Sequence, residues 1–280
     1  MRRTDTLLMA VVGALAVFVG VQVAHAPRLV HAAAKPSAHT ARPDQPKETA
    51  PPPPSPARPA IPAERMSAPD VALTVTQSAA AAPTRNLDDI HNRITGTPGT
   101  YMTSMIADLN GQLVRWPDRR ELGLRIWVQT ATSVRDWDLR YAQMARDAFA
   151  DWGTGRDGGG LPIRLDFVLD SATSDIQIVW LERFAPELGR RVGTTRRATD
   201  QNGWLVAAQI AVAVHDSTGR TIPPASLAGI VRHEAGHSLG LGHSTDANTK
   251  MFPVEMVSDI QPADRATLRL LYLLPPGQVR

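Results

Sequence analysis

The sequence predicts a mixed α/β (α+β) domain over residues 111–280. Some short segments alternate apolar and polar residues at strand spacing, and others repeat apolar residues at helical spacing. Their order along the chain is strand, helix, three strands, helix, loop, helix. All six tryptophans lie between Trp116 and Trp204, so aromatic material for a core begins only after about residue 110. A region of this length is an ordinary size for one domain.

Four segments are expected to form strands. In the first, LGLRIWVQ, every second residue is leucine, isoleucine or valine, which is typical of a strand with one buried face. The other segments either show the same alternation or are almost continuously apolar. The expected strands are residues 122–129, 163–169, 175–180 and 203–215.

Three segments are expected to form helices. Residues 133–152 carry apolar side chains at helical spacing from Tyr141 onward, which predicts one buried face. Ser133, followed three residues later by Asp136, resembles a capping box, so the helix is expected to begin there. The other two expected helices are residues 225–239 and a segment that follows Pro262.

Residues 1–26 are predicted to be a signal peptide or a membrane anchor. Arg2 and Arg3 precede an almost uncharged apolar run, Leu7–Val23, as in export signals. Ala24–Ala26 would suit cleavage, whereas an uncleaved run is just long enough to span a bilayer. In the second case residues 7–23 would associate with the membrane. Both alternatives place the remaining chain outside the cytoplasm, either secreted or membrane-tethered.

Residues 27–110 are predicted to be a disordered linker rich in proline and alanine. Eleven prolines lie within residues 36–70, a composition typical of a semi-rigid spacer. The boundary of the folded domain is expected between residues 86 and 112.

Charge and cysteine content exclude several classes. The first 100 residues carry ten Lys and Arg against seven Asp and Glu, and the remaining residues carry twenty of each. The folded region therefore has no excess positive charge, and no nucleic acid is expected as a partner. A cluster of arginines is expected in a solvated loop: Arg190, Arg191, Arg196 and Arg197. The absence of cysteine excludes disulfides and thiolate metal ligands.

The stretch VRHEAGHSLGLGHS, residues 231–244, holds three of the chain's eight histidines. On a helix with about 3.6 residues per turn, His233 and His237 lie one turn apart on the same face, so both rings can bind one ion. Gly240 can adopt a positive φ and end the helix, which returns His243 as a third ligand. Three imidazoles with an open position suit one catalytic Zn²⁺. Glu234 lies beside this face and is the candidate general base that activates zinc-bound water.

The pattern His233-Glu234-x-x-His237-x-x-Gly240-x-x-His243 resembles the signature of the metzincin metalloproteases. Met251 follows in HSTDANTKMFP, and this spacing is most similar to that of the matrixin family. The resemblance covers about residues 113–275. It implies a catalytic domain with a small twisted mixed sheet, an active-site helix, a methionine turn at Met251 and a C-terminal helix. It also implies that the strand around residues 209–214 forms the edge of a substrate cleft.

The resemblance raises further expectations about metals. Asp175 stands where the family often has a calcium ligand, and the alternative is an aspartate that caps a turn at the start of a strand. The second, structural zinc of animal matrixins is not expected, because His215 is the one histidine between Leu181 and Arg232. His215 is instead expected at the surface, at a strand end.

The predicted function is that of a zinc-dependent metalloendopeptidase acting on proteins or peptides outside the cytoplasm. Two alternatives remain open. One is a zinc-dependent hydrolase of a non-peptide amide, which would need a closed pocket in place of an open cleft. The other is a non-catalytic zinc-binding envelope protein, which would have no use for Glu234 as a base and would need a fourth ligand, for which Asp246 is the candidate.

Overall fold

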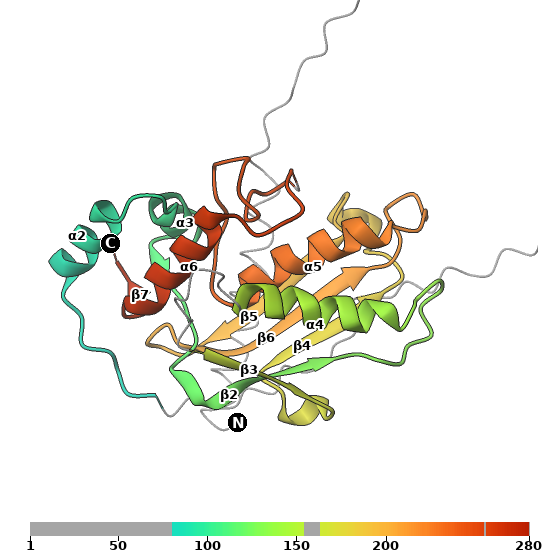
Figure 1. Ribbon diagram of the computed structural model, residues 1–280, viewed down its shortest axis with the longest axis horizontal. Coiled ribbons are helices and arrows are strands. Elements are labelled where there is room, and N and C mark those ends of the chain that lie inside the picture. The colour runs from blue at the N-terminus through green and yellow to red at the C-terminus, as the bar shows by residue number, and fades with distance from the viewer. Residues whose placement is uncertain (1–79, 154–162, 255, 280) are drawn as a thin grey trace, which may run out of the picture. The chain divides into compact units, whose positions relative to one another are not determined.

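A computed structural model of the chain describes residues 80–153, 163–254 and 256–279, all of which belong to the unit Ile61–Arg280. They form a mixed α/β fold (Figure 1), as the sequence predicts. The helices are α2 (Leu87–Gly96), α3 (Met102–Asp108), α4 (Arg140–Gly153), α5 (Pro224–Ser238) and α6 (Pro262–Leu273). The strands are β1 (Gln112–Leu113), β2 (Arg119–Val128), β3 (Ile163–Val168), β4 (Ile176–Leu181), β5 (Gly193–Thr199), β6 (Leu205–Ala213) and β7 (Gly277–Gln278).

The main sheet has five strands in the order β3-β2-β4-β6-β5. The first four run parallel to one another, and β5 runs antiparallel to β6 at one edge. Every residue of β4 and β6 is buried, which explains why these segments are nearly continuously apolar: strands covered on both faces do not alternate. β1 and β7 form a separate two-stranded sheet.

α4 and α5 lie side by side against one face of the main sheet (Figure 1). The buried side chains of α4 form the face that its helical spacing predicts. At the end of α4, the indole N–H of Trp152 donates to the Arg232 carbonyl of α5 at 2.8 Å. The other face of the sheet carries a smaller apolar cluster: Val179, Leu181, Phe184, Ala211 and Ala213, packed against Trp127. The helix with the histidine motif therefore rests on both a helix and a sheet.

α4 begins at Arg140, and the capping box predicted at Ser133 is wrong. Asp138 caps the helix instead, since its Oδ1 accepts a hydrogen bond from the Arg140 N–H at 2.8 Å. Asp136 has a left-handed φ of 57°, which a residue in the first turn of a helix cannot have. Its carboxylate contacts the His215 ring, so a tertiary contact replaces the local one.

The sequence does not predict β5. Its sequence, GTTRRAT, has no apolar alternation, because Ala198 is the one buried residue of this edge strand and the others are partly buried or exposed. The expectation that Arg196 and Arg197 lie in a solvated loop is therefore wrong. Arg196 is exposed on β5, whereas Arg197 is partly buried and points toward α5.

The folded region begins before residue 111. α2 and α3 lie inside the expected 27–110 linker, and their apolar side chains join the main core, including Ile90 and Met105. The Arg93 guanidinium also donates to the Leu273 carbonyl at 3.2 Å. The linker assignment is thus wrong for residues 87–110, because two short helices without tryptophan bury enough apolar surface against α6 and the core to fold with the domain.

The expected signal or anchor, residues 1–26, and the proline-rich segment lie outside the described residues. Among the helices that the structure does describe, none is both long and apolar enough to cross a membrane. The apolar run Leu7–Val23 is not among the residues to which this finding applies.

Candidate metal centre and active site

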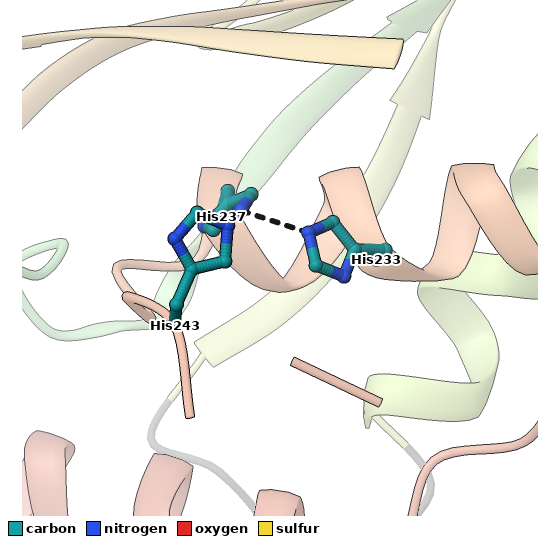
Figure 2. Close-up of side chains that lie close together, drawn as sticks. All are labelled: His233, His237 and His243. Carbon is teal, nitrogen blue, oxygen red and sulfur yellow. Dashed lines mark hydrogen bonds between the residues drawn. The ribbon is translucent and has the colours of Figure 1, made fainter. Parts of the chain in front are cut away.

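α5 carries His233 and His237 one turn apart, and both side chains leave the same face of the helix (Figure 2). Their Nε2 atoms are 3.0 Å apart, and the rings meet edge to face with their centroids 4.7 Å apart. Leu227, Val231 and Ala235 are fully buried on the opposite side of α5. The burial of these three side chains sets the rotation of the helix about its axis and therefore the direction of both histidines.

α5 ends at Ser238, and a glycine turn follows. Gly240 has a φ of 110°. Its N–H donates to the His237 carbonyl at 3.0 Å, and the N–H of Leu241 donates to the Gly236 carbonyl at 3.1 Å. These are the two hydrogen bonds of a Schellman motif, which ends a helix sharply.

This turn also passes close to the segment that precedes β2. A Cβ added at Gly240 would lie 2.3 Å from the Val114 carbonyl oxygen, so no other residue fits there. The chain then reverses and carries His243 back to the two helical histidines. The ring centroid of His243 is 4.7 Å from that of His237 and 5.6 Å from that of His233. The structure thus brings all three sequence-predicted ligands together.

Each of the three rings has its Nδ1 beside an oxygen that only accepts hydrogen bonds. The pairs are His233 with the Lys250 carbonyl at 2.9 Å, His237 with the Leu241 carbonyl at 2.9 Å, and His243 with Asp108 Oδ1 at 3.3 Å. The hydrogen of each neutral ring is therefore assigned to Nδ1, which leaves Nε2 with a lone pair. This is the tautomer that binds a metal through Nε2.

The three histidines fit a zinc site. One nitrogen from each lies within 4.8 Å of the others. Burial lowers the pKa of His233 to about 4 and that of His237 well below its usual value, so both rings are neutral at pH 7. Their Nε2 lone pairs then face each other at 3.0 Å, a repulsion that a shared cation relieves. Three imidazoles with further positions open are a donor set that catalytic zinc uses.

Asp246 is engaged elsewhere. Its Oδ1 accepts hydrogen bonds from the Asn248 backbone at 2.9 Å and from the Asn248 side chain at 3.0 Å. Among the described residues, the metal-ligand group contains the three histidines and no carboxylate. The arrangement therefore matches an open catalytic site better than a closed structural one.

Glu234 follows the first ligand on α5, and its side chain is buried. Thr195 on β5 donates a hydrogen bond to Glu234 Oε2 at 2.6 Å. Burial raises the pKa of Glu234 to about 7, although the hydrogen bond from Thr195 opposes this shift. Gly193 allows the close approach of β5, because a Cβ there would lie 2.6 Å from Glu234 Oε1. A carboxyl group with a pKa near neutrality is well suited to exchange a proton with a substrate.

Met251 is fully buried beneath α5. A Cβ added at Gly236 would lie 2.5 Å from the Met251 Sδ, so a glycine inside the helix makes room for the methionine. The backbone N–H groups of Lys250 and Met251 donate to the two oxygens of Asp264 at 2.8 and 3.3 Å. The turn thus positions the Lys250 carbonyl, which accepts the hydrogen bond from His233.

Residues 115–273, more than half of the chain, match the family model described as Matrixin, a peptidase family. The chain belongs to the matrixin family. The resemblance inferred from the histidine signature is therefore confirmed, and so is the fold class. The matched segment contains the three histidines, Glu234 and Met251, whereas α2 and α3 precede it.

Comparisons with individual proteins add little. No curated protein matches this matrixin chain. Among solved structures, a chain of the "GM1 bound form of the ECX AB5 holotoxin" is similar, with 16% identity, a TM-score of 0.41, and coverage of 61% of this chain and 87% of that chain. A similarity at this level carries no conclusion about activity.

In this matrixin the strand beside the site is β5, and the expectation of a cleft edge around residues 209–214 is wrong. Those residues lie on and just after β6, which has β4 on one side and β5 on the other. β5 is the edge strand. From it, Arg197 Nη1 donates to the carbonyls of His237 and Leu241, both at 3.2 Å, so the edge strand also braces the turn after α5.

Asp175, the candidate calcium ligand, binds arginine in the structure. Its buried carboxylate accepts hydrogen bonds from the Arg125 backbone N–H at 2.9 Å and from the Arg125 guanidinium at 2.9 and 3.1 Å. Arg119 lies 3.7 Å away as a second cation. A calcium ion would have to displace these positive groups. The contacts therefore favour a structural role, in which Asp175 connects the start of β4 to β2.

His215 is buried, and the expectation of a surface residue is wrong. Its Nε2 lies 2.9 Å from Asp136 Oδ2, and its Nδ1 lies 3.2 Å from the Glu182 carbonyl. The histidine therefore ties the loop before α4 to the end of β6. The sequence does not reveal this contact because its two partners lie far from His215 along the chain.

The sequence did not predict that four residues hold the site together: Asp108, Thr195, Arg197 and Asp264. Their contacts with the motif are tertiary; the hydrogen bond between Asp108 and His243, for example, joins positions 135 residues apart. Only Asp264 had a local signal, since it follows Gln261 by three residues and forms a capping box with it at the start of α6.

Proposed function

We propose that this matrixin is a zinc-dependent endopeptidase that hydrolyses peptide bonds outside the cytoplasm. Family membership and the histidine cluster support a zinc metallopeptidase. The observation that carries the catalytic assignment is Glu234, a buried carboxyl group next to the first of three histidine ligands. Hydrolysis needs a base at this position, whereas a structural metal site does not.

In the proposed reaction, Glu234 transfers protons and Thr195 holds the Glu234 carboxylate. When bound, zinc supplies a Lewis acid that polarises the scissile carbonyl and lowers the pKa of a water molecule. Glu234 accepts a proton from the attacking water and later delivers it to the leaving amine. Thr195 holds the Glu234 carboxylate by its hydrogen bond and favours the ionised form that accepts the proton.

The edge strand β5 supports a peptide as substrate. Among residues 80–153, 163–254 and 256–279, β6 is the single neighbour of β5 in the sheet. The other side of β5 can therefore pair with an extended peptide through backbone hydrogen bonds. Gly193 and Thr195 on this strand both approach Glu234. A peptide beside β5 therefore passes close to the general base.

Two alternative functions are less well supported. A hydrolase of a small amide would share the zinc and the base but would have no use for an edge strand beside them. A non-catalytic zinc protein would share the ligands, yet it gains nothing from a buried Glu234, and burial of a carboxyl group costs stability. The edge strand and the buried base together favour the endopeptidase.

The proposed location outside the cytoplasm is supported by the sequence. Arg2 and Arg3 before the apolar run Leu7–Val23 form the pattern of an export signal. Mass spectrometry of the N-terminus of the mature protein tests both alternatives. A new N-terminus after Ala26 would indicate secretion, and an intact N-terminus in the membrane fraction would indicate tethering.

The catalytic assignment is tested with wild-type protein beside Glu234→Gln, which keeps the size of the side chain and removes the base. We expect both proteins to bind one zinc, only the wild type to cleave a mixed peptide library at an appreciable rate, and a chelator to stop that cleavage. The rate in the variant should fall by about a thousandfold. Glu121→Gln, an exposed change on β2, is the matched control and should cleave normally.

Two results would contradict the proposal. Equal cleavage by Glu234→Gln would exclude Glu234 as the base. Zinc binding by the wild type without cleavage of any peptide in the library would remove the support for an endopeptidase, and non-peptide amides would then have to be tested.

A further inference from the structure

The last residue of α3 contacts the third ligand histidine. Asp108 Oδ2 accepts a hydrogen bond from the His243 backbone N–H at 2.9 Å, and Asp108 Oδ1 lies 3.3 Å from the His243 ring Nδ1. The two side chains are 23% and 24% exposed, so both are partly buried. One carboxylate therefore holds both the backbone and the ring of the same residue.

A glycine at a variable position of the histidine signature, Gly242, allows this close contact. A Cβ added at Gly242 would lie 3.0 Å from both Asp108 Oδ2 and Leu109 Cγ, and 3.1 Å from Met105 Cγ. A side chain at this position would force these three neighbours to shift and would disturb the contact of Asp108 with His243. The sequence LGLGH thus contains two glycines with different tasks: Gly240 reverses the chain, and Gly242 admits α3.

α3 is itself fixed in place by the core and by α6. Met102 and Met105 are fully buried. Just before the helix, the Tyr101 hydroxyl donates to Asp264 Oδ1 at 3.0 Å, and the Tyr101 backbone N–H donates to Thr267 Oγ1 at 3.0 Å. Asp108 is therefore presented to His243 by an anchored helix, even though α3 precedes the segment that matches the family model.

The three ligands differ in what supports them. The Nδ1 groups of His233 and His237 face backbone carbonyls that lie within the matched segment. His243 lies on an irregular segment after the helix, and its Nδ1 faces a carboxylate. A carboxylate partner fixes the ring orientation and tautomer and makes the opposite nitrogen a stronger metal ligand.

We propose that Asp108 is a positioning residue for zinc, so that α3 (Met102–Asp108) is part of the metal centre and not merely a cover for the core. This inference rests on the proposed zinc site, but it does not depend on peptidase activity. It makes the affinity for zinc sensitive to a residue outside the family's histidine motif.

The test measures zinc affinity by competition with a chromophoric chelator, using the full chain and its Asp108→Ala and Asp108→Asn variants. We expect zinc binding to weaken about 10- to 100-fold in Asp108→Ala. A smaller loss is expected in Asp108→Asn, because its single amide oxygen can serve only one of the two His243 donors. Asp88→Asn, an exposed change on α2, should bind zinc like the wild type.

A second measurement separates positioning from folding. Long-range ¹H–¹⁵N NMR spectra of the zinc-loaded proteins report the hydrogen on each imidazole. We expect His243 to carry its hydrogen on Nδ1 in the wild type and to show a perturbed Nδ1 resonance in Asp108→Asn, with His233 and His237 unchanged. Asp108→Asn is nearly isosteric with the wild type, so it keeps the test valid if Asp108→Ala does not fold.

Zinc affinity within twofold of the wild type in folded Asp108→Asn and Asp108→Ala would overturn the proposal, as would an unchanged His243 resonance. Glu234→Gln separates a failure of this proposal from a failure of the proposed function. This variant should lose peptide cleavage and keep its zinc affinity, whereas the Asp108 variants should bind zinc more weakly whether or not the protein cleaves peptides.

Discussion

Asp264 on α6 accepts a hydrogen bond from the Lys250 backbone N–H at 2.8 Å, and the Lys250 carbonyl in turn lies 2.9 Å from the His233 Nδ1. A single carboxylate thus connects the start of α6 to His233, the first of the three proposed zinc ligands. The same carboxylate accepts hydrogen bonds from the Tyr101 hydroxyl and the Gln261 N–H. Its position explains how the methionine turn is held beneath α5.

We predict that Asp264→Asn destabilises the protein by about 2–4 kcal/mol, because an amide nitrogen would face backbone donors in a buried site. Urea denaturation of the zinc-free protein measures the change in the free energy of unfolding. Asp259→Asn, an exposed change in the segment before α6, is the control and should stay within about 0.5 kcal/mol of the wild type. A similarly small effect in Asp264→Asn would show that the carboxylate is not needed to hold the turn.

Gly240→Ala should be strongly destabilising for two reasons. The substitution imposes a positive φ on alanine and places its Cβ 2.3 Å from the Val114 carbonyl oxygen. Gly219→Ala separates the two effects, because Gly219 also has a positive φ, 84°, but no atom lies within 4 Å of its would-be Cβ. We expect a loss of about 1–2 kcal/mol for Gly219→Ala, from backbone strain alone, and a clearly larger loss for Gly240→Ala. Equal losses in urea denaturation would contradict the predicted clash.

The stability of the zinc-free protein should depend on pH through Glu234. Burial raises the pKa of Glu234 to about 7 from a usual value of 4.5. The contribution of Glu234 to the free energy of unfolding is therefore fully present below pH 4.5 and is lost as the pH rises through 7. The free energy of unfolding falls by up to about 3 kcal/mol at pH 8 for this reason. The Glu234→Gln variant has no carboxyl group to ionise at this position. Its stability relative to the wild type should therefore increase as the pH rises from 4.5 to 8. A difference that is independent of pH from 4 to 8 would show that the Glu234 pKa is not raised.

Thr195→Val should lower kcat/KM by about 10- to 100-fold, because a hydrogen bond to a charged group is lost while the shape of the side chain is kept. Since that hydrogen bond lowers the pKa of Glu234, the acidic limb of the activity profile should move to higher pH. Zinc content should not change. Thr173→Val, an exposed change between β3 and β4, is the control and should retain normal kinetics. An unchanged profile in Thr195→Val would mean that Thr195 does not act on Glu234.

The sequence predicted what local periodicity and a short motif can specify. The buried face of α4 follows from apolar residues at helical spacing, and the buried strands β4 and β6 follow from nearly continuous apolar runs. The ligand set follows from the spacing of His233, His237 and His243, since a helical turn and a glycine reversal leave few other geometries. β5 was missed because only one of its residues is buried, so this edge strand lacks an apolar pattern.

By itself, then, the sequence determined the fold class, the family and the three histidines with Glu234 beside them, because these depend on residues close together in the chain. Only the tertiary structure decided which strand borders the site, where the domain begins, and which groups hold the ligands. Asp108, Thr195, Arg197 and Asp264 reach the motif from three different elements, α3, β5 and α6. No local pattern encodes such contacts, because they exist only once the helices and the sheet have packed together.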